Sequence, residues 1–212
     1  MFDQEQEIEN YILNHTDPED PVLFNLNRHT HLKTVNPRML SGHLQGSFLT
    51  MVSKMIRPSF ILEIGTFTGY SAICLAKGLA ENGVLHTIDI NDELRETNSL
   101  YIKEAGFEKQ IKLHTGEALK IIPTFNFSFD LVFIDAEKNE YRQYYQLVFD
   151  KIKQGGYIIA DNVLWSGKVA DKQFSDEATL ALRQFNDLIA GDSRVEKLIL
   201  PIRDGLMMIR KK

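Results

Sequence analysis

The feature that most constrains this chain is a regular alternation of strand-like and helix-like segments that starts at residue 60. Apolar runs typical of buried strands lie at 60–64, 84–89, 111–115, 130–134, 156–160, 195–200 and 205–210. Helical patterns lie between the first six runs, at 69–82, 92–106, 117–123, 138–153 and 176–191. Because helices that alternate with strands act as crossovers, this order predicts an α/β fold, with a mostly parallel sheet and helices on both faces.

The last two strand-like segments are connected differently from the others. Only "PIRDG" (201–205) separates them, which is too short for a crossover helix. They are therefore expected to form an antiparallel hairpin at the C-terminal end of the sheet. The complete prediction is a seven-stranded, mostly parallel sheet with one reversed strand.

The segment before the first strand is expected to be helical. The stretch "EQEIENYILN" places three apolar residues on one helical face, and a second helix is expected over 19–33. A third helix, "SGHLQGSFLTMVSKMI", has Ser41 as a possible N-cap and should end before Pro58. With 212 residues, 43% of them hydrophobic, the chain is expected to form a single domain over 1–212, made of this segment (1–58) and a core (59–212).

Charge and composition exclude several classes of partner. The net charge is −5 and no Lys/Arg run suggests a face that follows phosphates, so nucleic acid is not an expected partner. The acidic N-terminus lacks the apolar region of a signal peptide, and no apolar run approaches the ~18 residues of a membrane span. A single cysteine, Cys74, cannot form an intrachain disulfide, and a cytoplasmic protein is expected.

A glycine turn follows the first strand and indicates a cofactor site. Gly65 and Gly69 let the backbone approach a ligand closely, and Asp89 at the end of the second strand can accept hydrogen bonds from ribose hydroxyls. A pyrophosphate-binding turn has the pattern G-x-G-x-x-G, whereas this turn is G-x-x-x-G. The pattern favours a nucleoside cofactor without phosphates, such as S-adenosylmethionine; the alternative is a pair of ordinary turn glycines.

Oxygen ligands follow two further strands. Asp135 ends the fourth strand, and Asp161 and Asn162 end the fifth, which one right-handed crossover would bring alongside it. Two carboxylates and an amide suit a hard divalent cation, Mg²⁺ before Mn²⁺ or Ca²⁺. Either aspartate taken alone would be better interpreted as a cap or turn residue, but their coincidence beside a cofactor turn favours a metal site. Lys138 lies at a helix start, where the dipole disfavours a cation; it is either a solvated or paired lysine, or a functional one.

From Met39 to Arg210 the sequence resembles the cation-dependent class I O-methyltransferases, the group of catechol and caffeoyl-CoA O-methyltransferases and their small bacterial relatives. The motifs that carry the resemblance are "ILEIGTFTGYSAICLA", "IDAEKNEY", "ADNVLWSGKV" and "LPIRDGLMMIRK". The resemblance implies a Rossmann-like class I methyltransferase fold, S-adenosylmethionine and a divalent cation as cofactors, and a homodimer.

The resemblance also implies roles for particular residues. Lys138 is implied as the catalytic base, and Met39 and Trp165 as residues near the substrate. The implied metal ligands are Asp135, Asp161 and Asn162. The implied cofactor-binding residues are Ser41, Glu63, Gly65, Thr66, Phe67, Ser71, Asp89, Ala118 and Asp135.

The expected activity is methylation of one hydroxyl of a vicinal dihydroxy aromatic, a small phenolic substrate. Glu137, where plant members often carry Asp, and the short segment after Asn162 leave open whether the acceptor is a CoA ester. Two alternative functions are a nucleotide-dependent Rossmann oxidoreductase and a non-catalytic S-adenosylmethionine-binding protein. The first needs a pyrophosphate-binding turn that the sequence lacks, and the complete set of site residues argues against the second.

Overall fold

The computed structural model describes residues 2–212, with side chains from residue 7 onward. Its centre is one seven-stranded sheet of order β3-β2-β1-β4-β5-β7-β6, in which only β7 runs against its neighbours. The strands are β1 (Phe60–Ile64), β2 (Val84–Asp89), β3 (Ile111–Thr115), β4 (Phe129–Ile134), β5 (Ile152–Ala160), β6 (Val195–Leu200) and β7 (Leu206–Lys211). The predicted mixed sheet with its C-terminal hairpin is confirmed.

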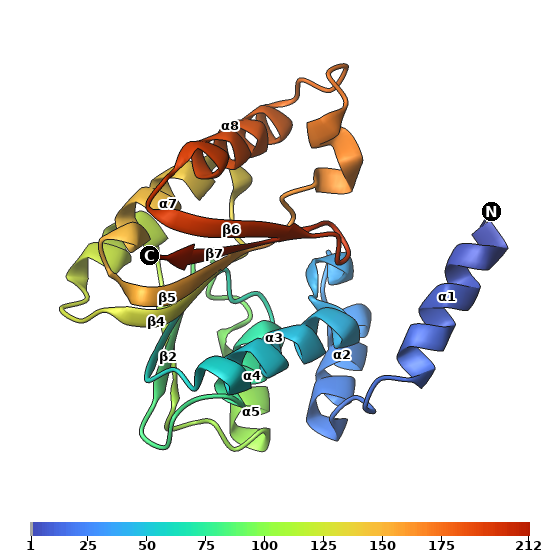
Figure 1. Ribbon diagram of the computed structural model, residues 1–212. Helices are drawn as coiled ribbons and strands as arrows, with labels where there is room; N and C mark the ends of the chain where they lie inside the picture. Colours follow the sequence, from blue (N-terminus) through green and yellow to red (C-terminus); the bar gives the residue numbers. More distant parts are fainter. Residues whose placement is uncertain (1) are drawn as a thin grey trace.

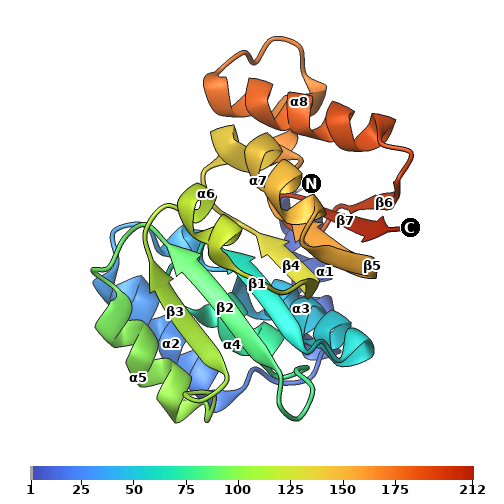
Figure 2. The ribbon, with the colours of Figure 1, turned by 90° about the vertical axis from the view of Figure 1, so that its left-hand side faces the viewer.

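Helices cover both faces of the sheet, as Figures 1 and 2 show. One face carries α2 (Pro21–Lys33), α3 (Gly42–Ile56), α4 (Tyr70–Ala76) and α5 (Arg95–Glu104). The other carries α6 (Ala118–Ile121), α7 (Tyr141–Phe149) and α8 (Glu177–Gly191). In Figure 1, α1 (Phe2–Asn14) stands apart from both layers. Short 3₁₀ helices are η1 (Pro37–Met39), η2 (Ile122–Thr124), η3 (Lys138–Glu140) and η4 (Trp165–Ala170).

The core consists of two apolar clusters, one on each side of the sheet. Alternate residues of a strand point to opposite faces, so Leu62 and Ile64 of β1 join the cluster under α6, α7 and α8. Ile61 of the same strand joins the cluster under α2, α3 and α4. The helices before β1 therefore contribute to the same buried core as the strands that follow.

Two predicted boundaries differ from the structure at the fourth crossover. The predicted helix 138–153 is instead the turn η3 followed by α7, which ends at Phe149. β5 begins at Ile152 rather than at 156, and its register with β4 shifts because Phe129 pairs with Ile152 while Leu131 pairs with Tyr157. Gly155 lies in the part of β5 where this register shifts, and its φ of 78° is one that glycine adopts readily.

The helix before β1 begins and ends where the sequence predicts. Arg57 adopts a left-handed φ of 52° directly before Pro58 and stops α3. Ser41 occupies the N-cap position, but its side chain makes no capping hydrogen bond. No helix among residues 2–212 is both long enough and apolar enough to cross a membrane.

Candidate active site

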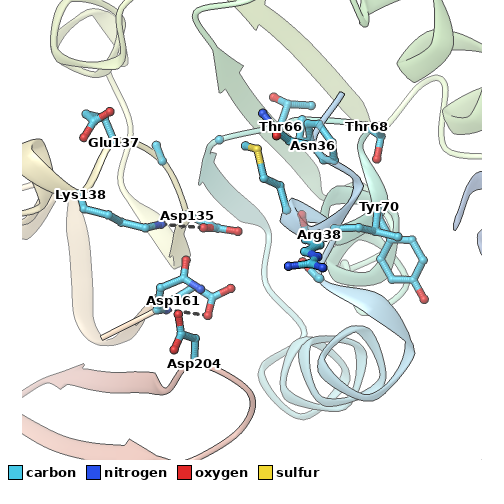
Figure 3. Close-up of a pocket in the computed structure, with 18 of the residues that line it drawn as sticks. Asn36, Arg38, Thr66, Thr68, Tyr70, Asp135, Glu137, Lys138, Asp161 and Asp204 are labelled. Atoms are coloured by element: carbon cyan, nitrogen blue, oxygen red, sulfur yellow. Dashed lines mark hydrogen bonds and ion pairs between the residues drawn. The ribbon is translucent and has the colours of Figure 1, made fainter. Parts of the chain in front are cut away.

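A cavity of about 900 Å³ opens at the carboxyl ends of β1, β4 and β5. This is the edge where ligands bind in open α/β sheets. Its wall includes parts of the chain that lie far apart in sequence: the segment 35–41, the turn after β1, the loops after β4 and β5, and Arg203 and Asp204 between β6 and β7. Figure 3 shows Lys138, Asp135 and Asp161 on one side of this cavity, with Thr66 and Arg38 on the other.

The glycine turn after β1 is shaped by close backbone contacts. Gly65 has a φ of 100°, and a Cβ atom there would lie 1.9 Å from the carbonyl oxygen of Asp135. Asp89 closes the turn from β2, because its Oδ2 accepts hydrogen bonds from the backbone N–H groups of Thr66 (3.0 Å) and Phe67 (2.8 Å). Without a side chain at position 65, β1 and β4 can bring their ends together.

Glu63 supports this turn from beneath. Its side chain is fully buried, Thr87 Oγ1 donates to its Oε2 at 2.6 Å, and Thr87 in turn lies 2.5 Å from Thr66 Oγ1. Burial, assisted by the negative charges of Asp135 and Asp89, raises the pKa of Glu63 to about 8. Its Oε1 has no hydrogen-bond partner among the described residues.

Asp135 and Asp161 lie side by side because β4 and β5 are in parallel register, with Ile134 opposite Ala160. The Asp161 carboxylate is almost completely buried, at 2% exposure. Its Oδ1 accepts from the Asn162 N–H at 2.7 Å, and its Oδ2 accepts from Gln45 Nε2 at 2.5 Å. Burial, followed by repulsion from Asp135, raises the pKa of Asp161 to about 6.

Lys138 enters the cavity from η3 and contacts one of these carboxylates. Its Nζ donates to Asp135 Oδ1 at 3.0 Å and to the Tyr141 hydroxyl at 2.8 Å. Tyr141 is fully buried, and its hydroxyl lies 3.1 Å from the Asp161 carbonyl oxygen and 3.3 Å from that of Ile134. One hydroxyl thus connects Lys138 with the ends of both strands that carry the aspartates.

The predicted metal ligands provide a donor set that fits a hard cation. Asp135, Asp161 and Asn162 all line the cavity, and two carboxylates lie close enough to raise the pKa of one of them. A divalent cation would relieve this repulsion, and carboxylate and amide oxygens are ligands that Mg²⁺ prefers. Among the described side chains, no group of three or more His, Cys, Asp or Glu residues is arranged as a metal site, so the predicted set depends on the Asn162 amide.

Most of the predicted site residues line this one cavity. They are Met39, Ser41, Gly65, Thr66, Phe67, Ser71, Asp135, Lys138, Asp161, Asn162 and Trp165. Glu63, Asp89 and Ala118 do not form part of its wall. Glu63 and Asp89 instead hold the turn, and Ala118 is buried at the start of α6.

The loop after Asn162 has an unusual backbone. Asn162, Trp165 and Ser166 adopt left-handed φ values of 58°, 48° and 53°. Such strain persists only where surrounding contacts fix it. Asp204 accepts the Ser166 N–H through Oδ1, and its carbonyl accepts the Leu164 N–H at 2.9 Å.

Arg183 of α8 holds the later part of this loop, residues 168–174, through hydrogen bonds. Its guanidinium donates to four carbonyl oxygens, those of Lys168, Val169, Asp171 and Phe174. The loop is thereby folded around one side chain and carries Trp165 into the cavity wall.

Several residues of the site carry no signal in the sequence. Gln45 lies within an apolar helical pattern, and nothing in its spacing indicates contact with Asp161. Arg203 and Asp204 belong to "PIRDG", which predicts only a turn. The position of Tyr141, three residues after Lys138, is compatible with the site but equally with the packed face of α7.

Comparison with known proteins agrees with this geometry. The chain matches the family model described as O-methyltransferase over residues 13–212. Caffeoyl-CoA O-methyltransferase 1 from Nicotiana tabacum is 33% identical over 179 residues, which cover 79% of this chain and 75% of that protein. A catechol O-methyltransferase from Niastella koreensis is 34% identical over 160 residues, which cover 74% of this chain and 72% of that protein.

A solved structure resembles the whole molecule. The O-methyltransferase TomG from Streptomyces achromogenes, which is involved in tomaymycin synthesis and was crystallised with S-adenosylmethionine, has a TM-score of 0.92 at 29% identity. The alignment covers 100% of both chains.

Fold and site together define a Rossmann-like methyltransferase. The chain belongs to the O-methyltransferase family. This membership confirms the predicted enzyme class.

Proposed function

We propose that the protein transfers a methyl group from S-adenosylmethionine to one hydroxyl of a vicinal dihydroxy aromatic, with a divalent cation bound by Asp135, Asp161 and Asn162. The observation that carries the proposal is the meeting of these oxygen ligands and Lys138 in the same cavity as the glycine turn.

The cofactor assignment is supported by the shape and chemistry of the turn. Gly65, Thr66 and Ser71 line the cavity, and the turn lacks the pattern of a pyrophosphate site. In this proposal the methionine part of the cofactor lies along the turn. Glu63 and Asp89 hold the turn in place, and Ala118 lies outside the cavity lining. We further propose that Asp89 accepts hydrogen bonds from the ribose hydroxyls of the cofactor.

The cation would be held on the opposite side of the cavity. Asp135 and Asp161 supply charge and Asn162 a neutral oxygen, with Mg²⁺ the preferred ion and Mn²⁺ or Ca²⁺ as alternatives. When bound, such an ion lowers the pKa of a coordinated hydroxyl and orients it.

In the reacting form Lys138 is the neutral amine, and its Nζ receives the proton of the reacting hydroxyl. The hydroxyl oxygen then donates an electron pair to the methyl carbon, and the carbon–sulfur bond breaks with its electrons remaining on sulfur. The products are a methyl ether, S-adenosylhomocysteine and a protonated Lys138. Alignment of two bound reactants supplies up to about 7–11 kcal/mol of barrier reduction in such reactions.

The acceptor is proposed to lie against Trp165 and Met39. Trp165 lines the cavity, and its indole Nε1 is buried without a hydrogen-bond partner in the part of the chain that the structure describes. The indole ring offers an apolar surface against which the ring of an aromatic acceptor can pack. Similarity to both a catechol and a caffeoyl-CoA enzyme supports an acceptor with adjacent ring hydroxyls.

The test is transfer of a labelled methyl group to catechol and to caffeoyl-CoA, with Mg²⁺ and after dialysis against EDTA. We expect Mg²⁺-dependent labelling of at least one of the two, and an Asp161→Ala variant that still binds S-adenosylmethionine but does not turn over. Labelling that persists undiminished in EDTA would exclude the cation from the mechanism.

We also propose a cytoplasmic homodimer; the single cysteine, Cys74, supports the location and the apolar side chains of α1 support the dimer. Ile8 and Tyr11 are 54% and 65% exposed on a helix that stands apart from its own chain. A second copy of the chain would cover them. Sedimentation of the wild type and of a variant with both residues changed to Ser measures this directly; equal masses for the two would contradict it.

A further inference from the structure

We propose that Gln45 is a positioning residue that fixes the Asp161 carboxylate for a divalent cation, and that Arg203 orients Gln45. This inference rests on the proposed function, because it assigns a role toward the same cation.

The contact joins two parts of the chain that are 116 residues apart. Gln45 lies on α3 with no exposed surface, and its Nε2 donates to Asp161 Oδ2 at 2.5 Å. Asp161 Oδ1 is held at the same time by the Asn162 N–H. Each carboxylate oxygen therefore has one fixed donor, so the carboxylate plane cannot rotate, while a second lone pair on each oxygen remains for a metal.

The chemistry of Gln45 suits this task. An amide donates a hydrogen bond without adding a positive charge, so it orients the carboxylate and does not compete with a cation. A lysine or arginine at this position would neutralise Asp161 and weaken metal binding. The neighbouring Asp135 differs in this respect, because it contacts the ammonium group of Lys138.

Arg203 determines which end of the Gln45 amide faces Asp161. An arginine side chain can only donate, and its Nη1 lies 3.4 Å from Gln45 Oε1. The amide oxygen must therefore face Arg203, which turns the NH₂ group toward Asp161. Without Arg203 the amide could rotate and present an oxygen to the carboxylate, which would repel it.

Arg203 is itself held firmly in the loop between β6 and β7. It adopts a left-handed φ of 50°, and its guanidinium also donates to the carbonyl oxygens of Leu40, at 2.9 Å, and of Ser41. These carbonyls belong to the segment that forms one wall of the cavity. A chain of contacts from this wall through Arg203 and Gln45 thus ends on a metal ligand.

The test measures binding of Mn²⁺ alone, by the loss of the free-ion electron paramagnetic resonance signal, without cofactor or substrate. Gln45→Met keeps the length of the side chain and removes the amide. We expect its Mn²⁺ affinity to fall about 10- to 100-fold, as is usual when a partner of a metal ligand is removed. The matched control is Ser53→Ala, another fully buried polar residue of α3, whose hydroxyl donates to the Leu75 carbonyl at 2.6 Å and should leave Mn²⁺ affinity unchanged.

A second variant tests the path through Arg203. Arg203→Met should weaken Mn²⁺ binding on its own, but should add nothing in the Gln45→Met background, because it acts through the amide. If Gln45→Met does not fold, Arg203→Met alone still tests the path, and unaltered Mn²⁺ affinity in that variant would refute it. Wild-type affinity in a folded Gln45→Met protein would overturn the proposal while leaving the proposed function intact. Absence of Mn²⁺ binding by the wild type would instead overturn the proposed function.

Discussion

The carbonyl oxygen of Asp135 occupies the space that a side chain on Gly65 would need, 1.9 Å from the position of a Cβ atom. The glycine turn after β1 and the end of β4, which carries the proposed metal ligand Asp135, are therefore in direct backbone contact. Any side chain at position 65 must separate β1 from the end of β4.

We predict that Gly65→Ala lowers both the stability and the cofactor affinity of the protein. The left-handed φ alone costs about 1–2 kcal/mol for a residue with a Cβ atom, and the collision with Asp135 adds to it. The control is Gly106→Ala, where φ is 81° but nothing lies within 4 Å of the added atom. Urea unfolding of both variants separates the two effects, and an equal loss in each would show that the contact with Asp135 is unimportant.

The Tyr141 hydroxyl is predicted to hold Lys138 in its reactive position. Tyr141→Phe keeps the ring in the core, where it packs at 5.5 Å against Phe185, and removes only the hydroxyl. We expect kcat to fall about 10-fold, a fraction of the 10²–10⁴ that a general base contributes, with little change in KM. Steady-state kinetics at saturating cofactor measure this.

The control for this variant is another tyrosine of α7, Tyr145. Tyr145 is also buried, but its hydroxyl donates to Asp192, outside the cavity. Tyr145→Phe should leave kcat unchanged. A Tyr141→Phe effect that persists fully in a Lys138→Met background would mean that the hydroxyl does not act through Lys138.

The alternation of segments was sufficient to predict the sheet, because crossover helices and a short final connection allow few other arrangements. The same logic placed Asp135 and Asp161 together, since the ends of neighbouring parallel strands meet at one edge. Gln45 and Arg203 could not be found this way. Their contacts depend on how α3 and the last hairpin pack across the sheet, and long-range packing leaves no periodic signal in a sequence.

Arg183 is predicted to determine acceptor binding through the loop that carries Trp165. Its guanidinium is the common partner of four loop carbonyls, so Arg183→Met should loosen the strained backbone around Trp165. We expect KM for the phenolic acceptor to rise about 10-fold, equivalent to about 1.4 kcal/mol, with unchanged S-adenosylmethionine affinity. The control is Arg210→Met, which removes an arginine paired with Glu196 on the exposed hairpin. A rise in cofactor Kd instead of acceptor KM would contradict this role.

Glu63 is predicted to make the stability of the ligand-free protein fall as pH rises. Its pKa is raised by burial from 4.5 to about 8, so between these values the native state binds a proton that the unfolded state has lost. Stability from this group is therefore complete below about pH 4.5 and is lost as pH rises through about 8, by up to roughly 1.4 kcal/mol per pH unit.

Glu63→Gln removes the titration while keeping the size of the side chain. In urea unfolding of metal-free and cofactor-free protein, the variant should gain stability relative to the wild type between about pH 6 and about pH 8.5, because only the wild type must take up a proton at this position when it folds. Glu108→Gln, at an exposed position, should show no such gain. A constant difference between Glu63→Gln and the wild type across this range would mean that Glu63 is already ionised at neutral pH, with a cation or polar group compensating its charge inside the fold.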